Sequence, residues 1–408
     1  MFRHHHSRPG HTVPAVVVLV VLALLVATAC VSASRAASAS AAPPSPAPSA
    51  QWTIAVYCDA DNDLEKYWDR YSLPGLLAVP ESEGVNVVAM VDRLSTGGTE
   101  LIEIGGGAQT VAATYPERNY GDGATLQWFI ETVRELYPST HLAVVMWDHG
   151  SGWRYIARDQ TSGGDRITMG ELGRALGDAG EQVDILAFDA CNMADVAVAY
   201  EAALSGRVGI MVASEESIPY NGFPYEEMLT PVAQDPSRTP DQVATDLVAG
   251  WKASYEALNW AKSAHLSAVD LTRIREAAPD LRSWSAALSA GLPLYKKAYT
   301  TAASASWTPW ATRYEDLGDL CAELSAGSAI ADPALKALSA TVAADLRAAL
   351  IAQDTAPKSA SATGLAIWWG VKNTWTAFQA DFAVQVSFAQ PAPRGVGWWD
   401  FLKAYNGK

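Results

Sequence analysis

His149 and Cys191 each come at the end of a short apolar run that stops abruptly at polar residues or glycine. The runs begin at His141 and Val183, and their composition is typical of buried strands in a parallel sheet. In open α/β sheets the ligand crevice lies beyond the carboxyl ends of the strands. The two side chains can therefore face one another across a cleft, where a cysteine nucleophile would exchange a proton with a histidine.

The residues after Cys191 predict a helix over 192–204, because apolar side chains recur there at three- and four-residue spacing. At a helix N-terminus the unpaired N–H groups and the helix dipole favour a thiolate. Taken singly, Cys191 could be a buried core cysteine and His149 an ordinary loop histidine. Their placement at matching strand ends favours the catalytic interpretation.

Two blocks around these residues closely resemble the histidine and cysteine blocks of the clostripain-like cysteine peptidases, which are relatives of caspases and gingipains. The blocks read Trp-Asp-His-Gly-Ser-Gly-Trp from Trp147 and Asp-Ala-Cys-Asn-Met-Ala from Asp189. Segment 52–65 resembles the opening strand and helix of that family, and segment 213–216 its strand after the cysteine helix. The resemblance implies an α/β fold, a caspase-like three-layer sandwich with a mainly parallel central sheet.

The resemblance also implies a role for each residue of the site. His149 and Cys191 would form a catalytic dyad, and the backbone N–H groups of Gly150 and Cys191 would hold the oxyanion. Asp189 would recognise an Arg or Lys side chain, since residues two apart on a strand point to the same side and Arg–carboxylate pairs are strong. Helix capping is the structural alternative for Asp189. The sequence identifies no third group that orients His149.

Two positions depart from the family pattern. Asp148 stands where an asparagine is expected, and Asn221 lies in a loop where relatives often carry a second acid near the specificity pocket. Loss of that second charge would weaken the preference for basic residues without abolishing it. If the pocket selects basic residues, Arg158 or Arg166 is a candidate site of self-cleavage.

The acidic run Asp59–Glu65 resembles the start of a calcium loop, with oxygen-bearing side chains at alternate positions. It does not fit an EF-hand, because Leu64 takes the glycine position and Arg70 the place of the closing glutamate. Helix capping and first-turn carboxylates explain the acids more simply. Clostripain is known as a calcium-dependent member of the family, so calcium in another geometry stays open. No metal ligand is assigned, and no cofactor is expected to be required.

Residues 1–30 have the layout of a secretory signal peptide, with arginines before an apolar run that ends in small residues. The segment Val26–Cys30 also fits a lipoprotein signal, although Ala27 replaces the usual leucine. Residues 31–50 form a linker rich in Ala, Ser and Pro. The chain is therefore expected to be secreted, or lipid-anchored through Cys30 on the extracytoplasmic face of a bacterial membrane.

Net charge and cysteine content narrow the range of partners. A net charge of −15 over 408 residues repels nucleic acid and suits soluble or basic partners. Peptide or protein substrates are what the resemblance to the peptidase family implies. The four cysteines are scattered, so the chain is not a disulfide scaffold. Core packing is the simplest role for Cys58 and Cys321. A monomer is expected.

Strand and helix patterns alternate over residues 51–240, which are predicted to form the catalytic domain, whereas residues 241–408 predict a mostly helical subdomain that completes the fold. A serine hydrolase is disfavoured because no G-x-S-x-G motif occurs, and a zinc hydrolase because no H-E-x-x-H motif occurs. The expected function is cleavage of peptide bonds after Arg or Lys through a covalent thioester. The alternatives are a catalytically silent, surface-anchored binding protein and a cysteine hydrolase that acts on other bonds.

Overall fold

The computed structural model describes residues 45–258, 265–309, 314–355, 360–370 and 372–407. The predicted signal peptide, Cys30 and most of the predicted linker lie outside these residues. At the end of the linker, the backbone N–H of Ala47 donates a hydrogen bond to the carbonyl of Leu136 at 2.8 Å. None of the helices described is long and apolar enough to cross a membrane.

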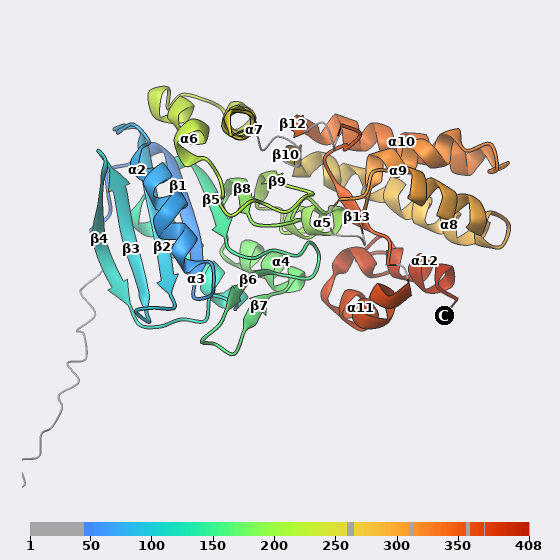
Figure 1. The fold of residues 1–408 in the computed structure, drawn as a ribbon, viewed down its shortest axis with the longest axis horizontal. Coiled ribbons are helices and arrows are strands. Elements are labelled where there is room, and N and C mark those ends of the chain that lie inside the picture. The colour runs from blue at the N-terminus through green and yellow to red at the C-terminus, as the bar shows by residue number, and fades with distance from the viewer. Residues whose placement is uncertain (1–44, 259–264, 310–313, 356–359, 371, 408) are drawn as a thin grey trace, which may run out of the picture. The chain divides into compact units, whose positions relative to one another are not determined.

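A nine-stranded sheet forms the centre of the described chain, in the order β12-β10-β9-β8-β5-β1-β2-β3-β4 (Figure 1). The five strands from β9 to β2 pair in parallel, while β3, β4, β10 and β12 pair antiparallel with their neighbours at the two edges. The mainly parallel sheet is confirmed. Its strands are β1 (Ala50–Ala60), β2 (Val85–Arg93), β3 (Thr99–Gly105), β4 (Ala108–Tyr115), β5 (Ser139–Trp147), β8 (Val183–Asp189), β9 (Val208–Ala213), β10 (His265–Asp270) and β12 (Leu350–Thr355).

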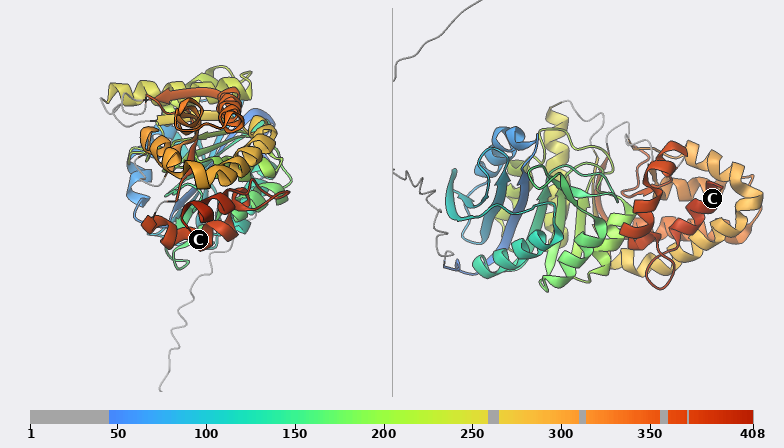
Figure 2. Two further views of the ribbon diagram at one scale, coloured as in Figure 1. Left: turned by 90° about the vertical axis from the view of Figure 1, so that its right-hand side faces the viewer. Right: turned by 90° about the horizontal axis from the view of Figure 1, so that it is seen from below.

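Helices cover both faces of this sheet (Figure 2). Alternate residues of each strand belong to two separate apolar cores: Tyr57 and Met146 to one, Val56 and Val145 to the other. The first core contains α3 (Gly123–Leu136), α4 (Met169–Asp178) and α5 (Val196–Leu204), and the second contains α2 (Leu73–Leu77), α6 (Tyr225–Gln234) and α7 (Pro240–Ala257). The predicted three-layer sandwich is confirmed, because strands buried on both faces need a helical layer on each.

The C-terminal part of the chain is mostly helical, and its helices gather beside β10 and β12 (Figure 1). Strands β10 and β12 belong to the nine-stranded sheet, so the C-terminal part of the chain also contributes two strands to it. Its elements are α8 (Leu271–Ala305), α9 (Leu317–Ala326), α10 (Pro333–Ala349), α11 (Lys372–Gln385), the 3-10 turn η3 (Ser387–Ala389) and α12 (Trp398–Tyr405), with β11 (Tyr314–Asp316) paired to β13 (Ala366–Trp368). The division at residue 240 stays a prediction.

The segment between the His149 and Cys191 blocks holds a hairpin that the sequence analysis does not predict. Residues 154–169 contain its two strands, β6 (Ile156–Asp159) and β7 (Asp165–Ile167). Helix α4 follows at once. Its start is marked in the sequence by a capping box in which Thr168 and Glu171 bond each other's backbone N–H.

Candidate active site

His149, Cys191 and Asp189 line one cavity of about 320 Å³. The cavity lies beyond the carboxyl ends of β5 and β8, which pair in parallel with Trp147 opposite Asp189. Because the two strands end in register, the residues that follow them meet at the same edge of the sheet. The remaining lining residues are Leu64, Tyr67, Trp147, Asp148, Ala190, Ser217, Ile218, Pro219, Tyr220 and Gly222. The structure thus brings together the three side chains that the sequence analysis singled out.

His149 has a carboxylate partner that the sequence analysis missed. Its Nε2 atom lies 3.1 Å from Oδ1 of Asp63, in the loop after β1. The hydrogen bond from His149 lowers the pKa of the Asp63 carboxyl below its usual value. A carboxylate only accepts hydrogen bonds, so Nε2 carries the proton and Nδ1 is left free to accept one.

Asp63 belongs to the acidic run Asp59–Glu65, which the sequence analysis explains by helix capping and first-turn carboxylates. Helix capping is wrong, because α1 (Glu65–Tyr67) begins after Leu64 and no side chain caps it, whereas Glu65 does lie in the first turn of the helix. The other acids of the run belong to the end of β1 and the following loop, where Asp63 reaches His149. Helix α1 continues directly into the π-helical turn η1 (Trp68–Ser72) and then α2.

Cys191 lies in a turn, not at the start of a helix. Helix α5 begins at Val196, with Asp195 as its N-cap. Asn192 adopts a left-handed conformation, with φ of 61°, and its side chain donates to the carbonyl of Glu215 at 2.7 Å. The prediction of a thiolate favoured by the helix dipole is therefore wrong, and the turn is held in place by the segment that follows β9.

The surroundings of Cys191 favour the thiol over the thiolate. Burial raises its pKa, and the nearby carboxylates of Asp189 and Asp148 raise it further. The Sγ atom donates a weak hydrogen bond to the carbonyl of Ile218 at 3.8 Å. Activation of this cysteine thus requires a base within reach, and His149 lines the same cavity.

Asp189 sits on a buried wall of the cavity, with 5% of its surface exposed. Its Oδ2 atom accepts hydrogen bonds from the backbone N–H of Phe223 and the hydroxyl of Tyr225, both at 3.0 Å. Burial raises the pKa of this carboxyl to about 7. Helix capping is wrong for Asp189, since Asp195 caps α5.

Gly222 keeps the approach to this carboxylate open. Its φ is +67°, and a Cβ atom at this position would lie 2.9 Å from Oδ2 of Asp189. Any side chain would therefore be strained by the backbone and would crowd the carboxylate. The hydroxyl of Tyr255 fixes the loop by donating to the carbonyl of Gly222 at 2.8 Å.

Gly150 lies against the cysteine turn, because a Cβ atom there would come within 2.7 Å of the carbonyl oxygen of Cys191. Among the described residues, neither the N–H of Gly150 nor that of Cys191 donates one of the backbone–backbone hydrogen bonds found in turns and loops. Two free N–H groups beside a nucleophile are what an oxyanion requires. The oxyanion assignment stays a prediction.

The sequence profile of the clostripain family matches residues 56–374, which is most of the chain. The chain belongs to the clostripain family. Clostripain from Hathewaya histolytica is 27% identical over 223 residues, which are 43% of this chain and 41% of that protein. The chain thus matches less than half the length of this clostripain, and the resemblance inferred from the two sequence blocks is confirmed.

Solved structures of clostripain-family proteases share the fold. A secreted C11 cysteine protease from Bacteroides thetaiotaomicron, bound to an irreversible peptide inhibitor, superposes with a TM-score of 0.63 at 18% identity. An inactive zymogen C11 protease from Parabacteroides distasonis gives 0.64 at 17% identity. Both alignments cover 87% of this chain and 99% of the other. At these identities the likeness concerns the fold.

The two departures from the clostripain-family pattern lie in different places. Asp148 accepts hydrogen bonds from the side chain of Asn62, at 2.8 Å, and from the backbone N–H of Arg158. Burial raises the pKa of Asp148 to about 8. Asp148 therefore ties the histidine loop to the loop after β1. Asn221 is not among the residues that line the cavity.

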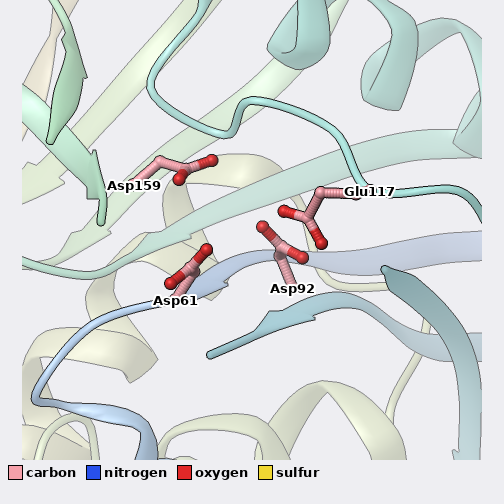
Figure 3. A group of neighbouring side chains, drawn as sticks. All are labelled: Asp61, Asp92, Glu117 and Asp159. Carbon is pink, nitrogen blue, oxygen red and sulfur yellow. The ribbon is translucent and has the colours of Figure 1, made fainter. Parts of the chain in front are cut away.

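A second group of acidic side chains lies outside the cavity. Asp61, Asp92, Glu117 and Asp159 each place one carboxylate oxygen within 4.8 Å of the others (Figure 3). Neither His149 nor Cys191 belongs to this group. Among the described residues, these four side chains are the group that could bind a metal ion.

Proposed function

We propose that this clostripain-family protein is an exported cysteine endopeptidase that cleaves peptide bonds after Arg or Lys. The observation that carries the proposal is the common cavity of His149, Cys191 and Asp189. It combines a nucleophile, a base and a buried carboxylate in a space of about 320 Å³. Such a site can bind a cationic side chain while the neighbouring peptide carbonyl meets the thiol.

The first half-reaction forms a thioester. Nδ1 of His149 takes the proton of Cys191, and Sγ attacks the carbonyl carbon of the scissile bond. The N–H groups of Gly150 and Cys191 hold the negative charge on the carbonyl oxygen. The C–N bond then breaks, and the departing amine takes the proton from His149.

The second half-reaction releases the product. His149 removes a proton from water, and the resulting hydroxide attacks the thioester carbonyl. The C–S bond breaks, and Cys191 recovers its proton from His149. Asp63 keeps Nε2 protonated throughout, through the hydrogen bond at 3.1 Å, and stabilises the imidazolium that forms in each half.

Charge favours a basic residue before the cleaved bond. Asp189 and Asp148 are both buried carboxyls that line the cavity, and no salt bridge among the described residues involves Asp189. A guanidinium or ammonium group there would be paired in a partly dry pocket, where charge-assisted hydrogen bonds are strong. The cation would also cancel the influence of Asp189 that raises the pKa of Cys191. A basic substrate would thereby help to activate the nucleophile that attacks it.

Export is supported by the signal-like segment 1–30 and the linker that follows it. We propose either free secretion or a lipid anchor on Cys30. Mass spectrometry of the mature N-terminus from the native host would separate the two: a diacylated N-terminal cysteine identifies the anchor, and an unmodified N-terminus identifies secretion.

The peptidase activity is tested with fluorogenic peptides that end in Arg, Lys, Asp or Leu before the reporter group. Under reducing conditions the full chain should hydrolyse the Arg and Lys peptides, and Cys191→Ala should hydrolyse none. Silence of the wild-type chain on the whole panel, with the fold intact by circular dichroism, would favour the catalytically silent binding protein instead.

A further inference from the structure

The buried carboxyl group of Asp195 joins the turn of Cys191 to the loop of His149. Asp195 follows that turn in the sequence and is fully buried, at 0% exposure. Its Oδ1 atom accepts a hydrogen bond from the backbone N–H of Ala197 at 2.8 Å, which caps α5. Its Oδ2 atom accepts one from the backbone N–H of Trp153, in the segment after His149, at 3.0 Å. One oxygen therefore serves the helix, while the other holds the histidine loop.

The hydroxyl of Tyr314 reaches this carboxyl group from the C-terminal part of the chain. Tyr314 begins β11, and its side chain is buried. Burial raises the pKa of Asp195 to about 7, and the hydrogen bonds that it accepts, the one from the Tyr314 hydroxyl among them, oppose this rise. The same hydroxyl lies 3.4 Å from the carbonyl oxygen of Ser151. Tyr314 thus contacts both the cap of α5 and the histidine loop.

Gly152 lies where these two side chains meet. Its φ is +56°, and a Cβ atom there would overlap the hydroxyl of Tyr314 and lie 3.0 Å from Oδ2 of Asp195. Any other residue would therefore be strained by the backbone and would push the pair apart. The histidine loop is fitted around Asp195 and Tyr314, so its shape depends on a residue from the C-terminal part of the chain.

The cysteine turn is held from the same direction by backbone hydrogen bonds. The N–H of Ala194 donates to the carbonyl of Ser214 at 3.0 Å, and the carbonyl of Ala194 accepts from the N–H of Ala366 at 2.8 Å. Ala366 begins β13, which pairs with β11. This strand pair thus supports the cysteine turn through Ala366 and the histidine loop through Tyr314.

We propose that Asp195 and Tyr314 position His149 and Gly150 against Cys191, an inference that rests on the peptidase function proposed above. Neither Asp195 nor Tyr314 is among the residues that line the cavity, so each acts through the backbone of the histidine loop. A misplacement of about 1 Å at reacting groups can slow a reaction about 100-fold. The C-terminal part of the chain thereby contributes to catalysis by geometry and not by contact with the peptide.

The test follows alkylation of Cys191 by iodoacetamide as a function of pH in the full chain. Tyr314→Phe removes one hydroxyl and keeps the buried ring. A histidine held close to a thiol favours its ionisation, so displacement of His149 should move the midpoint of the alkylation profile to higher pH by about 0.5 unit or more. In peptide hydrolysis, kcat should fall about tenfold or more with KM nearly unchanged.

The alkylation profile requires no peptidase activity, so the two proposals can fail separately. A wild type that cleaves no peptide, together with a shifted profile in Tyr314→Phe, would refute the endopeptidase and keep Tyr314 as the residue that positions His149. An unchanged profile in Tyr314→Phe would refute the positioning role, whatever the peptides show.

A second variant and two controls separate positioning from a general loss of stability. Asp195→Asn should shift the profile in the same direction, because its NH₂ group cannot accept a hydrogen bond. Tyr299→Phe is the matched control, since Tyr299 is buried in α8 and its hydroxyl has no hydrogen-bond partner among the described residues. Asp122→Asn, at the N-cap of α3 and outside the cavity, controls for the loss of a cap. Neither control should move the profile, and equal shifts in Tyr314→Phe and Tyr299→Phe would contradict a specific role for Tyr314.

Discussion

Nε2 of His149 lies 3.1 Å from Oδ1 of Asp63, a residue 86 positions earlier in the chain. The side chains of both residues are partly open to solvent, at 30% and 64% exposure. The contact joins the loop after β1 to the loop after β5, two neighbouring parallel strands of the sheet. In the proposed mechanism, Asp63 is the carboxylate that orients His149.

Replacing Asp63 by Asn should slow catalysis without weakening substrate binding. Asn can turn its NH₂ group toward Nε2 and favour the wrong imidazole tautomer, and it cannot stabilise the imidazolium. We expect kcat to fall by about 10²-fold, as for loss of acid–base assistance, with KM nearly unchanged. Steady-state kinetics on an Arg peptide measure both parameters.

Asp69→Asn is the matched control for that experiment. Asp69 is a half-exposed acid of the same segment that pairs with Arg93 and lies outside the cavity. Its replacement should leave kcat within about twofold, since exposed ion pairs contribute little. Equal losses in the two variants would mean that the segment, and not the contact with His149, matters.

Selectivity for Arg over Leu should depend on pH through Asp189. Burial raises the pKa of this carboxyl to about 7, and the groups that face it are the hydroxyls of Tyr225 and Tyr255 and the thiol of Cys191. Only the ionised carboxylate attracts a cation, so the ratio of kcat/KM for Arg and Leu peptides should fall as pH drops from 8 to 6. A ratio that is constant over this range would exclude Asp189 as the selecting charge.

The raised pKa of Asp189 also makes the stability of the folded chain depend on pH. The folded-state pKa of Asp189 is above its unfolded value of about 3.9, so the folded state binds more protons between about pH 4 and pH 7. The stability that protonation provides is complete below about pH 4 and is lost as pH rises through about 7. The Tm of Asp189→Asn, measured relative to that of the wild type at the same pH, should therefore be higher at pH 8 than at pH 5. Thermal unfolding at the two pH values measures this difference, and an equal difference at both would contradict the assigned pKa.

Gly222→Ala should impair cleavage after Arg. The new Cβ atom would lie 2.9 Å from Oδ2 of Asp189 in a backbone conformation with φ of +67°. We expect kcat/KM for Arg peptides to fall by about tenfold or more, from a loss of roughly 1–3 kcal/mol typical of such strain. Gly177→Ala in α4 is the control, because nothing lies within 4 Å of its added Cβ atom. Comparable activity in both variants would argue against crowding of Asp189.

Among the three cysteines of the described residues, alkylation should single out Cys191. Cys58 and Cys321 are fully buried, at 0% exposure, whereas Cys191 is partly open and lines the cavity. Because burial raises the pKa of Cys191, its reaction with iodoacetamide should accelerate as pH rises above 8. Peptide mapping by mass spectrometry after brief treatment identifies the labelled residue. Early labelling of Cys58 or Cys321 would contradict the described core.

Much of the fold was predictable because apolar patterns mark it directly. Strands β5 and β8 are continuous apolar runs, and α3 and α12 follow helical spacing to their ends. The hairpin β6–β7 was missed because its strands are short and rich in polar residues, held by tertiary contacts and not by pattern. Helix α6 was missed because a proline, Pro231, lies inside it.

The meeting of His149, Cys191 and Asp189 in one cavity was predictable, and the contacts that support them were not. His149, Cys191 and Asp189 occupy strand ends that the sequence marks. The helix after Cys191 was placed too early, because the apolar residues Met193 and Ala194 are buried in a turn that precedes the true N-cap. The contact of Asp63 with His149 and the four-acid group each join segments far apart in the chain, which no local spacing encodes.

The most direct measurement is covalent labelling of the full chain by peptidyl acyloxymethyl ketones that end in Arg or in Asp. In this reaction Sγ displaces the carboxylate leaving group from the methylene carbon. Mass spectrometry should find the Arg probe attached to Cys191, at a rate that falls about 10- to 100-fold in Asp189→Asn, with little labelling by the Asp probe. Equal labelling by both probes, or an adduct on another residue, would contradict a basic-selective peptidase built on Cys191.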